Sequence, residues 1–313
     1  MNALLIACLA CTAAAATGFA FLLAAETLRN RRRTCYHNLL RQRYLRIVMV
    51  ALFAERPAVP HFPLLRRRGS RLLLAETLAG LGAMTYGLPT GLLSEITARY
   101  RLDEWLLRRA RFAQGYRRAR YLALLSELPA TESVSRHAAR YGDSRNRYVR
   151  FYALMIALTA EPPAALQRMA GCAWAFSATE VAEITTALRR GLLPIAYRPL
   201  VASASPNLRR VGLSIVRQFG IEEAGPQLLQ LLDDDETAVA QADVLHTLCA
   251  LRRPLLCREV RHSLGRMKPA ERRTLMRCMA RSSYAPELLR RLFNKNECAY
   301  YETIVQSHKR CLV

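Results

Sequence analysis

Histidines and cysteines near the end of the chain have the types and spacing of metal ligands. The group consists of His246, Cys249, Cys257, His262, His308 and Cys311. Two pairs follow the pattern His-x-x-Cys, which places both side chains on one helix face, and imidazole and thiolate groups bind zinc. The paired Cys-x-x-Cys of a structural zinc site is missing, so packing between helices is favoured and a metal site is the alternative. We predict no cofactor.

Catalytic motifs are missing from the sequence. It contains no phosphate-binding loop of the GxGxxG or GxxxxGK[ST] type and no Gly-x-Ser-x-Gly nucleophile motif. The acidic run at residues 233–236 could bind a cation. Negative charge also stabilises the N-terminus of a helix, so capping is the favoured interpretation. We therefore expect a protein that is not an enzyme and has no catalytic residue.

The strongest functional signal is a segment in which arginines alternate with aromatic residues. Its members are Arg99, Tyr100, Arg101, Trp105, Arg108, Arg109, Arg111, Tyr116, Arg117, Arg118, Arg120 and Tyr121. Three interpretations stay open: a solvated helical face, contact with anionic lipid or a membrane protein, and nucleic-acid binding, in which arginines neutralise phosphates and aromatics stack on bases. Because exposed arginines contribute little to stability, we expect folding to survive charge reversal here.

The charge is distributed unevenly. The formal net charge is +23, and almost all of the basic residues are arginine. Residues 26–150 carry 25 arginines and 9 acidic residues, a net of +16, whereas residues 151–313 carry 22 basic and 15 acidic residues, a net of +7. This asymmetry indicates an anionic neighbour for the first half, either lipid headgroups or nucleic acid.

The N-terminus has the length and composition of a membrane anchor. Ala3–Ala25 contains 23 residues and no charge, which is enough to cross a hydrocarbon core of roughly 30 Å. A secretory signal peptide would need a basic start, and only Met1 and Asn2 precede the apolar run. A lipoprotein signal ending at Cys8 or Cys11 would have too short an apolar stretch. We expect an uncleaved transmembrane helix.

Arginines directly after this span set its expected orientation. The positive-inside rule places the rest of the chain in the cytoplasm, and the nine cysteines, odd in number and scattered, fit a reducing compartment. The expected location is the inner (plasma) membrane of a bacterium, with a single pass. The predicted contacts with anionic lipid or a partner are Arg29, Arg31, Arg32, Arg33, Arg108, Arg109, Arg111, Arg117, Arg118 and Arg120.

Leu72–Leu93 is long and apolar enough to suggest a second span. Glu76 and Pro89 argue against it, since a charge in mid-membrane costs about 2.5–3.5 kcal/mol. A buried helical hairpin broken near Gly87-Leu88-Pro89 is favoured, although the sequence alone leaves the second span open.

From about residue 114 the sequence is periodic. Pairs of small or apolar residues mark the centres of successive amphipathic helices: Leu124-Leu125, Ala157-Leu158, Ala187-Leu188, Ile215-Val216, Thr247-Leu248 and Met279-Ala280. The separations of 33, 30, 28, 32 and 32 residues match the length of a helix–turn–helix unit. Short second helices are predicted at roughly 132–141, 164–171, 193–203, 226–232, 255–265 and 285–293.

The repeats resemble the HEAT family. The residues that carry the likeness are Tyr148-Val149-Arg150 with Ala153 and Ala157-Leu158, then Leu208-Arg209 with Gly212 and Ile215-Val216, and the junction Leu231-Leu232-Asp233-Asp234-Asp235 with Val239. At Val239-Ala240 the usual arginine is missing. The resemblance implies an armadillo-type superhelical scaffold that binds macromolecules across a concave surface, without catalysis. Some HEAT-like proteins are bilin lyases, which is a further alternative.

The sequence thus predicts an all-α fold, with an N-terminal transmembrane helix followed by a right-handed α-α superhelix, a HEAT-like solenoid. Its expected parts are an anchor (1–28), a basic juxtamembrane and irregular helical region (29–113) and HEAT-like repeats (114–313). The expected function is protein–protein interaction at the cytoplasmic membrane face, with a membrane-bound enzyme such as a glycosyltransferase as one partner class. A nucleic-acid-binding tether is the alternative. The sequence leaves the partner, the pathway and the oligomeric state open.

Overall fold

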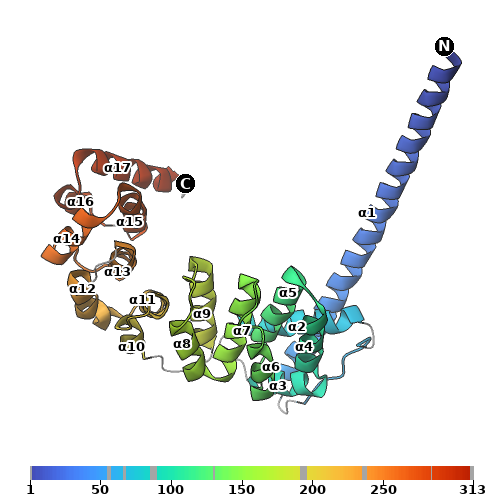
Figure 1. Ribbon diagram of the computed structural model, residues 1–313, viewed down its shortest axis with the longest axis horizontal. Coiled ribbons are helices and arrows are strands. Elements are labelled where there is room, and N and C mark those ends of the chain that lie inside the picture. Colours follow the sequence, from blue (N-terminus) through green and yellow to red (C-terminus); the bar gives the residue numbers. More distant parts are fainter. Residues whose placement is uncertain are drawn as a thin grey trace. The chain divides into compact units, whose positions relative to one another are not determined.

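In the computed structural model, all regular secondary structure in the described part of the chain is helical, and that part contains no strand (Figure 1). That part comprises residues 2–54, 58–65, 68–84, 90–129, 131–190, 196–234, 238–282 and 284–310. Within these ranges the side chains of residues 2–16, 33, 68, 83–84, 90, 132, 190, 234, 238–240, 286 and 308–310 are not described. The all-α prediction is confirmed for the described residues.

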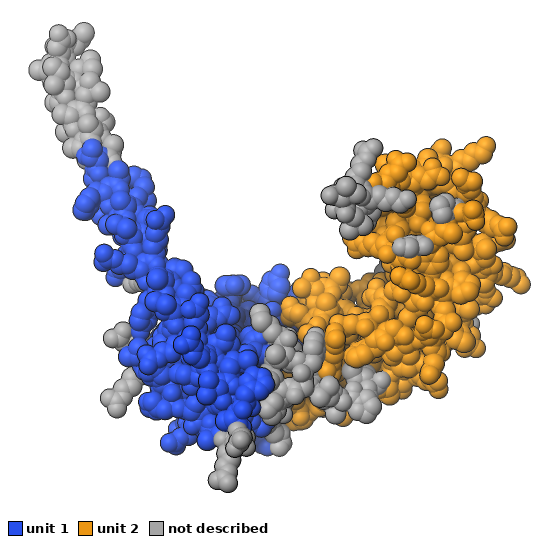
Figure 2. Space-filling view, turned by 180° about the vertical axis from the view of Figure 1, so that it is seen from behind, with its two compact units in different colours: residues 1–156 blue, residues 157–313 orange. Residues whose placement is uncertain are grey.

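The chain divides into two compact units, residues 1–156 and residues 157–313 (Figure 2). The division falls within one helix, α7 (Arg147–Ala160). Each unit has its own hydrophobic core.

The first unit opens with a long helix, α1 (Asn2–Leu52). Among its described side chains, the buried ones lie in the last quarter of the helix: Leu40, Tyr44, Val48 and Ala51. These residues recur every three or four positions, so they form one stripe along the helix. Every described side chain from Thr17 to Leu39 is exposed. Packing therefore holds α1 to the unit at its C-terminal end.

Five further described helices belong entirely to the first unit: α2 (Arg68–Met84), α3 (Thr90–Arg99), α4 (Leu102–Phe112), α5 (Gly115–Ser126) and α6 (Glu132–Ala139). Helix α7 belongs to it up to residue 156. Helix α2 packs against α1 and α5, and α4 packs against α3, α5 and α6. The Leu72–Leu93 segment contributes to both α2 and α3, and its Leu74 and Leu78 are buried in the core. Its predicted break at residues 87–89 lies outside the described residues.

Nothing in the described part of the chain meets the requirements for a membrane span, because no helix there is both long and apolar enough. In the predicted span Ala3–Ala25, the side chains of residues 3–16 are not described, and these are more than half of the span. The anchor therefore stays a prediction.

The second unit consists of short and long helices in alternation. They are α8 (Pro162–Ala170), α9 (Ala178–Arg190), α10 (Tyr197–Val201), α11 (Pro206–Phe219), the 3-10 turn η1 (Glu222–Ala224), α12 (Gly225–Asp234), α13 (Ala238–Ala250), α14 (Arg258–Arg266), α15 (Pro269–Arg281), α16 (Pro286–Leu292) and α17 (Lys295–Arg310). The long helices pack in succession, α9 on α11, α11 on α13, α13 on α15 and α15 on α17. Helix α12 packs in the same way on α14.

This alternation follows the predicted helix pairs, since each predicted second helix overlaps one of α6, α8, α10, α12, α14 and α16. Local signals set the helix starts. Proline stands in the first turn of α8, α11, α15 and α16, where its missing N–H costs no hydrogen bond. The Thr131 hydroxyl accepts a hydrogen bond from Val134 N and so caps α6. Residues 235 and 236 of the predicted acidic cap lie outside the described residues, and Asp233 is in the last turn of α12.

Helix α11 approaches α10 closely. A Cβ atom at Gly212 would lie 2.8 Å from Val201 N and 2.9 Å from Leu200 Cβ. Nearby, the buried Asn207 accepts a hydrogen bond from Phe176 N at 2.9 Å and donates one to Trp174 O at 3.0 Å. These contacts fix the loop before α9 and the short α10 against one face of α11.

Candidate anion-binding surface

A two-residue turn joins α3 to α4 and gathers several arginines. Helix α3 ends at Arg99, α4 begins at Leu102, and Arg101 between them has a left-handed backbone, with φ 49° and ψ 45°. A non-glycine residue in this conformation is uncommon and stores strain. The Arg101 carbonyl starts α4 by accepting from Trp105 N at 3.1 Å. The sharp turn keeps both helix ends, and their basic side chains, close together.

The arginines around this turn line a cleft of about 310 Å³. Its walls are Arg71, Arg99, Tyr100, Arg101, Glu104, Trp105 and Arg108. Four guanidinium groups therefore face one carboxylate, and that carboxylate, Glu104, is already paired with Arg101. The same ion pair raises the pKa of Arg101. The remaining positive charge makes the cleft suited to an anion with several oxygen acceptors, such as a phosphate group.

Aromatic packing holds one wall of the cleft in place. The Tyr100 hydroxyl donates to Pro60 O at 2.8 Å, and its ring meets the buried Phe62 edge-on at 5.4 Å. Phe62 in turn packs against Tyr44 of α1, whose hydroxyl donates to Pro63 O at 2.7 Å. The cleft and the C-terminal part of α1 are thus connected through the segment at residues 58–65.

Two of the predicted contact arginines make contacts within the fold. Arg118 is half-buried, and its Nε donates to Ala110 O at 3.2 Å and to Ala113 O at 2.9 Å. Its guanidinium also lies over the Tyr141 ring. Arg120 forms an ion pair with Glu76 of α2. The expectation that charge reversal leaves folding intact therefore does not extend to Arg118.

The other predicted arginines of α4 and α5 are more available. Arg109 is half-buried and stacks on Trp105 at 5.5 Å, and Arg111 is exposed beside Phe112. Arg108 and Arg117 are exposed, with no hydrogen bond or ion pair to another described residue. Only Arg108 of this group lines the cleft.

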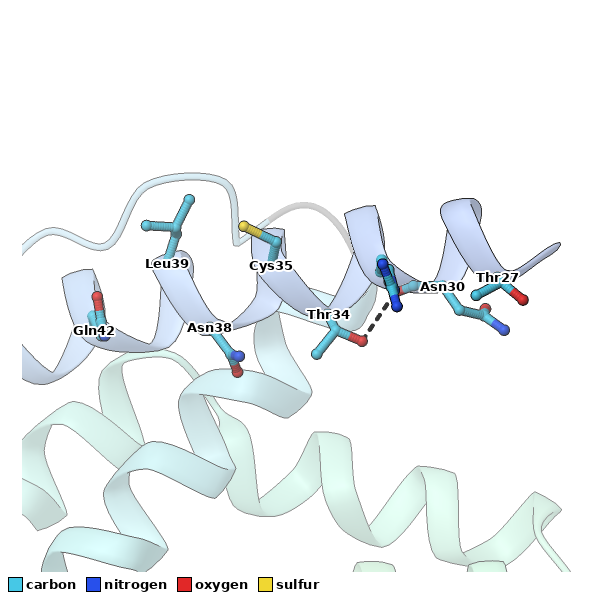
Figure 3. Close-up of a pocket in the computed structure, with 8 residues that line it drawn as sticks. Thr27, Asn30, Thr34, Cys35, Asn38, Leu39 and Gln42 are labelled. Atoms are coloured by element: carbon cyan, nitrogen blue, oxygen red, sulfur yellow. Dashed lines mark hydrogen bonds between the residues drawn. The ribbon is translucent and has the colours of Figure 1, made fainter. Parts of the chain in front are cut away.

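The predicted contact arginines of α1 lie before its packed part. Arg29, Arg31 and Arg32 are exposed, and the Arg33 side chain is outside the described residues. A hollow of about 620 Å³ follows the same stretch, between Thr27 and Gln42 (Figure 3). All of its lining residues belong to α1, and the Thr34 hydroxyl bonds back to Asn30 O at 2.9 Å, as Figure 3 shows. This hollow is the open face of one helix and not a cavity between elements.

Arg71 is the cleft arginine that sequence reasoning missed. It stands in α2, far along the chain from the arginine-rich segment, and its Nε donates to Leu65 O at 3.2 Å. Arg71 ends the basic run of residues 66–71, which is a signal of charge, but no local pattern pairs it with Arg99.

The histidines and cysteines do not gather as the sequence grouped them. Among the described residues, no three of His, Cys, Asp and Glu are placed to hold a metal ion. Cys249 is fully buried in the core of the second unit, Cys257 precedes α14, and His262 is exposed. The His308 side chain and Cys311 lie outside the described residues. Cys249 instead meets Cys278 of α15, a residue outside the predicted group.

No family model matches the chain, and no curated protein or solved structure shows significant similarity to it.

Proposed function

We propose that this chain is a membrane-anchored helical scaffold. Its N-terminal helix spans the plasma membrane of a bacterium, with the rest of the chain in the cytoplasm. The cleft between α3 and α4 binds the phosphate group of an anionic lipid, and the HEAT-like helix pairs hold a protein partner at the membrane. In this proposal the protein is not an enzyme.

The exposure of α1 is the observation that carries the proposal. Phe19, Phe21 and Leu22 are 64%, 75% and 67% exposed, although the helix continues without a break into the packed unit. Large apolar side chains in water cost about 25 cal/mol per Å² of exposed apolar surface. A helix also gains little stability in water without packing. A lipid environment removes the first cost, and a helix satisfies its own backbone groups there.

The charges support the same arrangement. In α1 the apolar residues are followed by Glu26 and then by Arg29, Arg31 and Arg32, all exposed. Basic side chains in this position interact with anionic headgroups by about 1 kcal/mol each. The cleft adds Arg99 and Arg108, which have no ion-pair partner among the described residues.

The scaffold role rests on the successive packing of α9, α11, α13, α15 and α17 in the second unit. Stacked helix pairs of this kind present one extended surface, because each pair contacts mainly its neighbours. Such surfaces bind macromolecules across several pairs.

Membrane fractionation tests the anchor. The full chain is expected to stay with membranes through high-salt and alkaline washes and to be released by detergent. Phe19→Asp with Leu22→Asp should shift the chain toward the wash, because a charge within the apolar span costs up to about 3 kcal/mol, the highest cost being at the centre of the span. Tyr36→Asp with Leu39→Asp is the matched control, with the same spacing on the exposed face beyond the predicted span. Release of the unchanged chain by salt alone would refute the anchor.

Lipid titration tests the cleft. Short-chain phosphatidylglycerol, added to the detergent-extracted chain, should change the fluorescence of Trp105, which lines the cleft. Phosphatidylcholine should not. Arg99→Gln with Arg108→Gln should weaken binding by about 2 kcal/mol, roughly 30-fold.

Arg111→Gln with Arg117→Gln removes the same charge outside the cleft and serves as control. An equal loss in both double variants would mean that general charge, and not the cleft, binds lipid. Cleft-dependent binding of single-stranded DNA in preference to the lipid would favour the nucleic-acid tether instead.

A further inference from the structure

The second unit contains a pair of thiols beside a histidine. The Cys278 thiol donates a hydrogen bond to the backbone oxygen of His246 at 3.9 Å, which places its sulfur against α13 three residues before Cys249. Cys249 of α13 and the His246 side chain are therefore the neighbours of the Cys278 sulfur. Both cysteines are free. The contact follows from the repeat, because His246 and Cys278 are 32 positions apart and occupy equivalent places on the successive helices α13 and α15.

The two sulfurs differ in access. Cys249 is fully buried, whereas Cys278 is half-buried. A small solute can therefore reach Cys278 before Cys249, which lies deeper in the core next to the Cys278 sulfur. This is the arrangement in which one thiol is attacked and a second one resolves the product.

The surrounding charges favour a thiolate at Cys278. The neighbouring Cys249 thiol, the His246 side chain and the positive charge of Arg217 on α11 together lower the pKa of Cys278 to about 5. The pKa of Cys249 is raised, by its contact with Cys278 and by burial. Burial and the neighbouring sulfurs also raise the pKa of Tyr284, so this hydroxyl stays protonated.

A rigid frame holds the pair. The Tyr284 hydroxyl donates to Arg253 O at 2.8 Å, which fixes the segment before α16 onto the end of α13. The buried Tyr301 of α17 donates to Tyr284 O at 2.9 Å. Helices α13, α15 and α17 are thus tied together around the two thiols.

We propose that Cys249 and Cys278 form a peroxide-reactive dithiol that closes to a disulfide between α13 and α15. The Cys278 thiolate attacks one oxygen of hydrogen peroxide, the O–O bond breaks, and the leaving hydroxide takes a proton to become water. Cys278 is then a sulfenic acid. The Cys249 sulfur attacks it, the S–O bond breaks, and the hydroxide leaves with the Cys249 proton as a second water. Two thiols are oxidised and one peroxide is reduced to two waters.

The first test is peptide mapping of the full chain after treatment with hydrogen peroxide and blocking of free thiols. Trypsin places Cys249 in peptide 218–252 and Cys278 in peptide 278–281. The expected product is these two peptides joined by a disulfide, separated again by a reductant. Absence of the joined peptides while other cysteines oxidise would overturn the proposal.

Two variants test the order of events. In Cys249→Ala, dimedone should label Cys278, because the sulfenic acid persists without its resolving thiol. In Cys278→Ala, Cys249 should stay reduced. Cys298 is the control, since it is also half-buried but its pKa is raised by burial. The Cys298→Ala variant should form the Cys249–Cys278 disulfide like the parent chain. In Cys249→Ala, dimedone labelling of Cys298 as fast as that of Cys278 would count against the dithiol.

Discussion

Arg117 and Arg118 are neighbours in sequence with different roles, and they offer a sharp test of the first unit. Arg118 reaches back from α5 to the end of α4, where its Nε donates to Ala110 O and Ala113 O. Its guanidinium covers the Tyr141 ring at 5.5 Å. Arg117 is exposed and makes no hydrogen bond or ion pair within the described residues. The perturbation is replacement of each arginine by glutamine.

The cost of Arg118→Gln follows from these contacts. A hydrogen bond from a charged donor contributes about 1.5–3 kcal/mol, and the low end applies because Arg118 is only half-buried. The cation–π contact adds about 0.5–1 kcal/mol. The expected destabilisation is therefore about 2–2.5 kcal/mol. Arg117→Gln should change stability by less than about 0.5 kcal/mol.

Far-UV circular dichroism of the detergent-extracted chain measures the difference. For a unit of this size the Arg118 variant should melt about 5–10 °C lower, and the Arg117 variant should melt like the parent. Equal melting temperatures for the two variants would refute the structural role of Arg118. Arg118 would then be interpreted, as the sequence predicts, as a contact for lipid or a partner.

Three further predictions follow from other parts of the chain. Gly212→Ala should destabilise the second unit by about 1–3 kcal/mol, because its Cβ would clash with α10; Gly265→Ala, with open space, should be neutral or stabilising by thermal melting. Because a lowered pKa keeps Cys278 ionised when Cys298 is protonated, iodoacetamide should label Cys278 about tenfold faster than Cys298 at pH 6, and this advantage should disappear by pH 9; equal rates at pH 6 would contradict the thiolate. A reporter active only in the cytoplasm, fused after Val313, should be active, and activity of a periplasmic reporter there would reverse the proposed topology.

The helix pairs could be predicted from the sequence because their signals are local. Apolar residues at helical spacing, and breakers such as Pro162 and Pro206, act within one or two turns of the chain. The centres of α11 and α13 were therefore predicted at their observed places, near Ile215 and Thr247. The excess of arginine in the first half is likewise a property of the sequence.

Only the tertiary structure decided which arginines are available for a partner and which bond within the fold. Arg117 and Arg118 look alike in the sequence, but the packing of α5 against α4 gives only Arg118 a hydrogen bond to the end of α4. Arg71 joins Arg99 in one cleft because the turn between α3 and α4 meets the start of α2. Composition carries no information on such distances.

The pair formed by Cys249 and Cys278 could be predicted from the sequence only in part. The 32-residue period placed Cys278 in the position equivalent to His246, so stacking of adjacent repeats predicts a contact between the two helices at this level. The sequence could not tell that Cys249 lies next to Cys278. That choice depends on the rotation of α13 and α15 about their axes, which the buried side chains around them determine together.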